Sequence, residues 1–517
     1  MWCLDERALN NTVFKSSRMN NTRVSGAAGL PADLQAALTT LANMMAADDE
    51  RVSSLIDPTQ PLVGARAPAR LDVMGGIADY SGSAVLQMPL KESTVILCQH
   101  NDNHEFTIVS LTADNGLDTQ SVSLPMRDFF AQSASIPPDG PLRSEADMKA
   151  YFGNLPEHEH WVAYIAGVLT VLMLHCDVRP RQGITIVVQS SVPVAKGVSS
   201  SAALEVATMR AMCGLFGVNV PAHRQAVLCQ RVENLIVGAP CGLMDQMASS
   251  CGQQGALLNM LCQPDLVKEP VELPEELAVW GIDSGIRHAV SGADYGTVRV
   301  AAFMGYRYIL ELAGIAASHV PADAIDDHKW YGYLANVQVS EFIQEYYAKL
   351  PECVSGREFL NRFDATTDSV TQIHHDQQYQ VRACTAHPIH EHFRVRLFSQ
   401  LARSAAQASC IDDLATLMGE SMYQSHASYS SCGLGCSECD DLVARLAAEG
   451  VSNGIYGARI TGGGSGGTVA VLAKRTAVDA VYSIAQEYAA NAGVGGYVFD
   501  GSSDGGSAYP LSATIAT

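Results

Sequence analysis

Basic residues are scarce in this sequence. Of 517 residues, 33 are Lys or Arg and 54 are Asp or Glu, which gives a formal net charge of −21. A chain this acidic has no electrostatic basis for binding nucleic acid or an anionic membrane. Any anionic ligand would need a local positive field, supplied by helix N-termini and a few Arg or Lys side chains.

Long hydrophobic runs are also absent. The most apolar run, 161–174, ends at His175 and is too short to cross a bilayer, so it predicts a buried helix. The N-terminus has no apolar core of the signal-peptide type. The 14 cysteines are too dispersed for a disulfide scaffold, which favours free thiols in a reducing compartment. We therefore expect a cytoplasmic protein.

The remaining sequence mixes short strand patterns with amphipathic helix patterns, which is typical of an α+β fold. We expect residues 1–60 to be a partly disordered extension with a helix at 34–45, 61–285 a first domain and 286–517 a second. The last strand, at 496–500, is a candidate to return to the first domain. Strands are predicted at 62–67, 93–98, 105–111, 184–189, 256–261, 277–283, 454–461 and 468–472. Later helices are predicted at 294–314, 336–349, 389–408, 411–427, 438–449 and 475–491.

The segment Pro193–Ala203 is a Gly/Ser loop between the strand pattern 184–189 and a helix that begins near Ser200. Free backbone N–H groups and the helix dipole make such a helix start a candidate phosphate site. The segment lacks the GxxxxGK[ST] pattern of a Walker A loop. An ordinary serine helix cap is the structural alternative.

Two further segments, 67–82 and 232–249, carry charged residues that are candidates for a site. Arg70 follows a predicted strand, and Asp79 lies in a Gly-flanked turn. Glu233 lies on an apolar helix pattern, and Asp245 opens the next helix, where a carboxylate is suited to act as a base. Taken singly, each fits an ion pair, a helix cap or a solvated helix position equally well.

A third segment, 457–468, carries six glycines between two predicted strands and allows a close approach of backbone to ligand. The three segments together, in this order, resemble the GHMP kinases, and Ala67-Pro-Ala-Arg70 with Gly75-Gly-Ile-Ala-Asp-Tyr-Ser-Gly82 resembles their galactokinase branch. The segments 71–82, 196–202, 281–288 and 461–468 are most similar to the plant-type L-arabinokinases. Those proteins usually carry a large glycosyltransferase-like domain before the kinase, whereas only about sixty residues precede it here.

The resemblance implies a two-lobed fold, with the active site between the lobes, that phosphorylates a sugar at its anomeric hydroxyl. Asp245 would be the base, Arg70 would neutralise the transferring phosphoryl group, and Ser201 and Glu233 would hold Mg²⁺. ATP would lie on Lys196, Gly197, Val198, Ser199, Ser200, Ser201 and Ala202. The sugar pocket would include Asp79, Gly76, Ile77, Gly242 and Tyr295. The implied partners are a small-molecule sugar and ATP, and a monomer is compatible with the sequence.

The substrate prediction depends on two positions. Galactokinases have Glu and His where this chain has Gly76 and Ile77, and these residues contact the sugar on the side of its C6 hydroxyl. A buried carboxylate without that hydroxyl would cost about 1–3 kcal/mol, so its removal suits a pentose. L-arabinose is therefore expected; D-galactose, D-galacturonate and a non-catalytic sugar sensor remain the alternatives.

Two clusters suggest metal sites only superficially. Cys432, Cys436 and Cys439 lack a fourth ligand at matching spacing. The histidines between 374 and 392 lack a regular i, i+4 pattern, and a solvated helical segment is the simpler interpretation. Neither cluster is assigned a metal.

Overall fold

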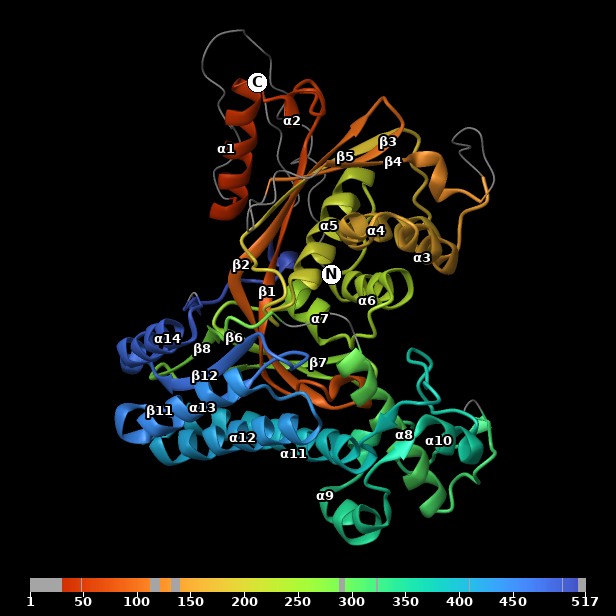
Figure 1. Cartoon of the computed structure of the whole chain (residues 1–517). Helices are drawn as coiled ribbons and strands as arrows, with labels where there is room; N and C mark the ends of the chain where they lie inside the picture. Colours follow the sequence, from red (N-terminus) through yellow and green to blue (C-terminus); the bar gives the residue numbers. More distant parts are fainter. Residues whose placement is uncertain are drawn as a thin grey trace.

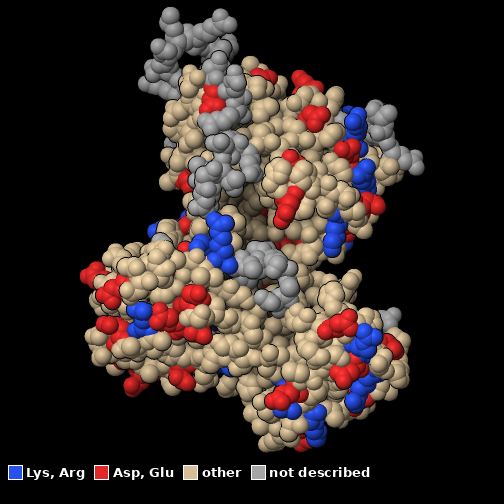
Figure 2. Space-filling model, viewed as in Figure 1, with Lys and Arg blue, Asp and Glu red and all other residues tan. Residues whose placement is uncertain are grey.

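The computed structural model describes residues 30–47, 49–111, 121–131, 140–287, 293–321, 324–408, 410–494 and 496–509. Figure 1 shows two lobes, each with a sheet and packed helices, which confirms the predicted mixture of helices and sheets. No helix among these residues has the length and apolarity needed to cross a membrane. The face in Figure 2 shows Asp and Glu side chains over both lobes and a hollow where the lobes meet.

The first lobe contains a seven-stranded sheet in the order β4-β3-β5-β2-β6-β7, with β1 paired to β2. Neighbouring strands run antiparallel, except that β3 and β5 are parallel. The strands are β1 (Val63–Met74), β2 (Ala84–Asn101), β3 (Glu105–Ser110), β4 (Ser121–Pro125), β5 (Gly183–Ser190), β6 (Ala256–Leu261) and β7 (Leu266–Glu272). The predicted strands at 62–67 and 93–98 are parts of the longer β1 and β2.

Both faces of this sheet are covered, because alternate residues of a strand point to opposite sides. Ile96 and Cys98 pack with α4 (Ala163–His175) and α5 (Ser200–Phe216) in one core cluster. Val95 and Leu97 pack on the other side, against α1 (Ala32–Ala46). The other helices of this lobe are α2 (Glu50–Ser53), α3 (Glu145–Gly153), α6 (Ala222–Arg231) and α7 (Met244–Cys251).

Helix α1 confirms the helix predicted at 34–45 within the N-terminal extension. It packs on the sheet through Leu34, Leu38 and Leu41, all of them buried, and Asp33 pairs with Arg66 of β1 at 2.5 Å. The described part of the extension, from residue 30 onward, therefore belongs to the folded first lobe. Residues 1–29 lie outside the described residues.

The second lobe contains a four-stranded sheet in the order β11-β12-β8-β13. Its strands are β8 (Leu277–Asp283), β11 (Ile455–Ile460), β12 (Thr468–Lys474) and β13 (Val498–Phe499). Strand β8, which ends just before the predicted domain boundary at 285, pairs with β12 and β13. Strand β13, the candidate for a return to the first domain, stays in this second sheet; beyond it, Ser502 forms an isolated bridge to Leu90 of β2.

Long helices surround this second sheet. They are α8 (Ala293–Leu312), α11 (Val381–Ala405), α12 (Asp412–Ser431), α13 (Ser437–Glu449) and α14 (Val478–Ala492). Smaller elements are α9 (Val339–Glu341), β9 (Val354–Ser355), α10 (Gly356–Phe363) and β10 (Gln378–Tyr379). The helix predicted at 336–349 is wrong as a single helix, because a π-helical turn at Phe342–Tyr346 and a 3₁₀ turn at Tyr347–Lys349 interrupt it.

Candidate functional site

The Gly/Ser loop leads from β5 to the N-terminus of α5, as predicted. Ser199, at the position before the helix, has φ of 63° in the left-handed region and makes no side-chain cap bond within the described residues. Its hydroxyl instead donates to Oδ2 of Asp245. Ser199 is therefore not an ordinary helix cap, and the first turn of α5 keeps the amide field that anions bind.

Arg70 and Asp245 form a two-pronged ion pair. Arg70 Nε and Nη2 donate to the two carboxylate oxygens of Asp245, each at 2.8 Å. Arg70 Nη1 donates to the Gly197 carbonyl at 2.7 Å. Arg70 is buried, whereas the Asp245 side chain is 19% exposed. This geometry fixes a partly accessible carboxylate beside the Gly/Ser loop.

Asp79 lies close to the same carboxylate. Burial raises the pKa of the Asp79 carboxyl to about 7, with the Asp245 charge adding to the shift and Arg299 opposing it. Asp79 Oδ1 is buried without a hydrogen-bond partner among the described residues. A Cβ added to Gly242 would fall 1.6 Å from Asp79 Oδ2, so a larger residue there would displace the Asp79 carboxylate. The Asp79 carboxyl is available to accept hydrogen bonds from a ligand.

Tyr295, near the start of α8, belongs to the same neighbourhood. Burial and the Asp79 charge raise the pKa of its phenol. Its ring meets the ring of Tyr80 edge-on, with centroids 5.9 Å apart. The structure thus brings Tyr295, Asp79 and Gly242 together, as the resemblance to the GHMP kinases implied.

The structure leaves no free space beside Gly76 and buries Ile77. A Cβ on Gly76 would lie 1.9 Å from Tyr429 Oη and 2.2 Å from Asp72 Oδ2, so the space beside this glycine is already filled. Ile77 is fully buried and has a φ of 50°, which is rare for a β-branched residue. Neither residue presents a charged or hydrogen-bonding side chain to a ligand.

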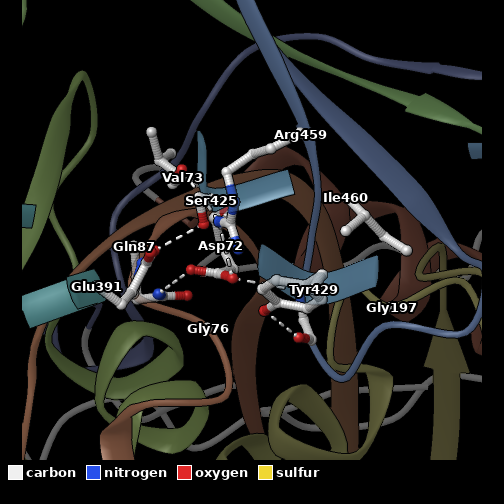
Figure 3. A network of polar contacts seen from close by, with 12 residues as sticks. Asp72, Val73, Gly76, Gln87, Gly197, Glu391, Ser425, Tyr429, Arg459 and Ile460 are labelled. Atoms are coloured by element: carbon white, nitrogen blue, oxygen red, sulfur yellow. Dashed lines mark hydrogen bonds and ion pairs between the residues drawn. The ribbon is translucent and has the colours of Figure 1, made fainter. Parts of the chain in front are cut away.

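The filled space is part of a buried polar network (Figure 3). Asp72 accepts from Gln87 Nε2 at 2.7 Å and pairs with Arg459 Nη1 at 3.1 Å. Tyr429 Oη donates to the Gly462 carbonyl at 2.7 Å. Glu391 accepts from the Gly75 amide at 3.0 Å. The network joins the turn that carries Asp79 to the glycine-rich loop 461–467.

His387 extends this network, contrary to the solvated segment expected there. It is fully buried, and its Nε2 donates to the Gly76 carbonyl at 3.0 Å. Burial lowers the pKa of His387 to about 4, so the ring is neutral near pH 7. The sequence offers no periodic signal for this role, because the contact joins residues far apart in the chain.

Glu233 and Ser201 lie together, as implied, and two further residues join them. The Gln246 amide donates to Glu233 Oε2 at 2.6 Å and to Glu205 Oε2 at 3.2 Å. Glu205 is fully buried, and its Oε1 has no hydrogen-bond partner among the described residues. Sequence reasoning missed Glu205, although an acidic residue within the apolar run of α5 was an available signal.

This group fits a magnesium ion, which prefers hard oxygen ligands. Burial raises the pKa of Glu233 to about 7, with Asp245 adding and Ser201, Cys241 and Gln246 opposing. Two close buried carboxylates, one with an unpaired oxygen, would be relieved by a cation. No set of three or more His, Cys, Asp or Glu side chains in the described part of the chain could hold a metal alone. Phosphate oxygens would have to complete the coordination.

The Gly/Ser loop of the first lobe contacts β8, β12 and the glycine-rich loop of the second lobe. Lys196 Nζ pairs with Asp283 Oδ2 of β8 at 2.9 Å, and the Thr468 hydroxyl donates to the Lys196 carbonyl at 2.7 Å. A Cβ on Gly462, whose φ is 61°, would lie 2.8 Å from the Gly197 carbonyl. The glycines of this loop thus allow the close backbone approach that the sequence suggested, here to the Gly/Ser loop.

Comparisons with known proteins agree with this arrangement. The family described as GHMP kinases N terminal domain matches residues 163–253, and that described as GHMP kinases C terminal matches residues 402–491. The first match contains the Gly/Ser loop, Glu233 and Asp245.

Individual relatives point the same way. L-arabinokinase of Arabidopsis thaliana is 39% identical over 485 residues, covering 85% of this chain and 46% of that protein, so this chain spans less than half its length. Galactokinase of Actinobacillus succinogenes is 28% identical over 430 residues, covering 83% of this chain and 89% of that protein. Lactococcus lactis galactokinase complexed with galactose has the same fold, with a TM-score of 0.65 and 19% identity over 90% of this chain and 99% of that chain. The chain belongs to the GHMP kinase family, and the two relatives above are named as sugar kinases.

Proposed function

We propose that this protein is a sugar 1-kinase that transfers the γ-phosphoryl group of ATP to the anomeric hydroxyl of L-arabinose, giving β-L-arabinose 1-phosphate and ADP. The observation that carries the proposal is the Asp245 carboxylate, fixed by the two-pronged Arg70 contact beside the Gly/Ser loop. Asp79, with its unpaired buried oxygen, stands near it as a sugar-hydroxyl acceptor.

In the proposed mechanism, the phosphates of ATP lie against residues 196–202 at the N-terminus of α5. Asp245 accepts the proton of the C1 hydroxyl as that oxygen attacks the γ-phosphorus and the bond to ADP breaks. Arg70 neutralises charge on the transferring group. Ser201 and Glu233, with Glu205 behind them, would hold Mg²⁺, which neutralises phosphate charge when bound.

The proposed preference for L-arabinose depends on what the Asp79 turn lacks. Gly76 and Ile77 offer no polar partner to a hydroxymethyl or carboxylate substituent on the sugar ring. A site that leaves such a group without a hydrogen bond disfavours it, at about 1–3 kcal/mol. L-arabinose has the ring stereochemistry of D-galactose without the hydroxymethyl. The 39% identity to an L-arabinokinase supports the same choice.

The test is an ADP-release assay with Mg-ATP that compares L-arabinose, D-galactose and D-galacturonate at equal concentrations. We expect the highest kcat/KM with L-arabinose. A preference for D-galactose would keep the mechanism and overturn the substrate. Absence of turnover with every sugar, combined with sugar-dependent thermal stabilisation, would indicate a sensor instead of a kinase.

A further inference from the structure

A Cys-x-x-Cys sequence, Cys436-Ser-Glu-Cys439, stands at the N-terminus of α13 and has no part in the proposed phosphoryl transfer. Cys436 is the cap residue of this helix, and its Sγ accepts a hydrogen bond from the Cys439 amide at 3.4 Å. Amides at a helix start stabilise a thiolate, which is the nucleophilic form of cysteine. The position therefore favours a reactive Cys436.

The two thiols differ in exposure and in proton affinity. Cys436 is half-buried and Cys439 is fully buried. A hydrogen bond from the Cys439 thiol is the main cause that lowers the pKa of Cys436 to about 7, with burial and the Glu438 and Asp440 charges opposing. The same contact raises the pKa of Cys439. Cys436 is thus the partly exposed thiol that ionises more readily, and Cys439 is the buried thiol that keeps its proton.

We propose that Cys436 and Cys439 form a thiol–disulfide exchange site that reacts with the disulfide of a low-molecular-mass thiol. The Cys436 thiolate attacks one sulfur of that disulfide, forms a mixed disulfide and releases one thiolate. Cys439 then loses its proton and attacks Cys436 Sγ, which releases the second thiolate. The added disulfide is reduced to two thiols, and the protein dithiol is oxidised to the Cys436–Cys439 disulfide.

Other cysteines in the described residues do not combine these features. Cys384 and Cys432 share a thiol contact between α11 and the end of α12, but both are buried. Cys410 is exposed and is not part of a Cys-x-x-Cys sequence. It therefore serves as an internal control for simple exposure.

The exchange site contacts the loop that borders the nucleotide site. The Leu434 carbonyl accepts from the Ser465 amide at 2.7 Å. The Cys439 thiol contacts Ser284, whose hydroxyl donates to the Gly467 carbonyl at 2.6 Å. Disulfide formation draws Cys439 Sγ away from Ser284. Ser284 is next in sequence to Asp283, whose carboxylate pairs with Lys196. We therefore expect disulfide formation to weaken the interaction with ATP, an expectation that rests on the proposed kinase function.

The first experiment is chemical and does not depend on activity. The full chain is equilibrated with glutathione disulfide, quenched with N-ethylmaleimide and mapped by mass spectrometry. We expect a Cys436–Cys439 disulfide to form before Cys410 is modified. In Cys439→Ser, the glutathione adduct should accumulate on Cys436, and in Cys436→Ser, Cys439 should stay reduced. Modification of Cys436 no faster than Cys410, or no intramolecular disulfide, would overturn the proposal.

The second experiment measures the KM for ATP of the oxidised and the re-reduced protein. We expect at least about a fivefold rise on oxidation, the lower end of typical coupling between sites, with the KM for the sugar little changed. Cys439→Ser, which cannot form the disulfide, should show no such rise when treated alike. An unchanged KM with the disulfide present would overturn the link to the nucleotide site alone. A protein that forms the disulfide but phosphorylates no sugar would leave the exchange site standing and refute the proposed function.

Discussion

Asp245 is held by more contacts than a helix cap requires. Arg70 contacts both of its oxygens, and Ser199 donates to one of them. Asp245→Asn should lower kcat by about 10²–10⁴-fold, because the amide cannot accept the hydroxyl proton. Nucleotide affinity, measured by calorimetry, should be nearly unchanged. Asp265→Asn, at a surface pair with His223, is the matched control and should keep full activity. Comparable turnover in Asp245→Asn would remove Asp245 from the role of base.

If Glu233 holds Mg²⁺ as proposed, its carboxyl should give magnesium binding a pH dependence. Its carboxyl has a pKa of about 7 in the ligand-free protein, above the ordinary value of 4.5, chiefly because it is buried. The folded state therefore gains stability from the protonated form at low pH and loses it as the pH rises through about 7. Mg²⁺ requires the ionised form, so the affinity for the Mg²⁺ complex of a non-hydrolysable ATP analogue should rise up to about pH 7 and then level.

Calorimetric titration of that complex across this pH range is the measurement. Glu233→Gln should bind more weakly and lose the rise with pH, because the amide does not titrate. A retained rise in the variant would assign the titration to another group.

Gly76 illustrates a residue that only three-dimensional packing explains. In Gly76→Ala the new Cβ would meet Tyr429 Oη at 1.9 Å and Asp72 Oδ2 at 2.2 Å. Overpacking of this kind costs about 1–3 kcal/mol, so the midpoint of chemical denaturation should fall. Activity should fall with it, since Asp79 follows on the same turn. Gly153→Ala, where no atom lies within 4 Å of the new Cβ, is the control and should be neutral or nearly so. Equal stability of the two variants would contradict this packing.

At the level of elements, an ion pair joins a strand of the first lobe to a strand of the second. Asp72 and Arg459 are a fully buried ion pair between β1 and β11. Asp72→Asn would leave the Arg459 charge without its partner, at about 3–5 kcal/mol. We expect the free energy of unfolding, from urea denaturation, to fall by that amount. Asp376→Asn breaks the exposed pair with Arg357 and should have no measurable effect. A small loss in Asp72→Asn would mean that the pair contributes little.

These elements also show what the sequence could predict. Regular amphipathic helices such as α12 and α13 were found close to their bounds, because their apolar spacing is strong. Strand β1 was predicted too short, since Arg70 and Asp72 interrupt the apolar pattern and serve the site and the network instead. The helix at 336–349 was wrong because its π and 3₁₀ turns leave no mark in spacing.

The candidate site divides in the same way. Arg70, Asp79, Asp245 and the Gly/Ser loop stand in compact motifs, and sequence alone brought them together. Glu205, Tyr429 and His387 reach the site through contacts across long stretches of chain, and no local pattern encodes those contacts. Their identification required the packed structure.

At the scale of the whole molecule, α1 completes the first lobe by covering the sheet face opposite α5 (Figure 1). Leu38 is fully buried there, beside Val95 and Leu97. Leu38→Ala should lower the free energy of unfolding by about 2–5 kcal/mol, the range for a deleted core leucine. Its kcat should not change at a temperature where the variant is folded, because α1 and α5, the helix that follows the Gly/Ser loop, lie on opposite faces of the sheet.

Thr39→Ala, at an exposed position on the same helix, is the matched control for that experiment. Circular dichroism during urea denaturation gives the stability, and ADP release gives the rate. If Leu38→Ala and Thr39→Ala were equally stable, α1 would be only loosely attached to the first lobe. If Leu38→Ala instead lowered kcat while fully folded, the sheet would transmit the packing of α1 to the site, and the two faces could not be treated as independent.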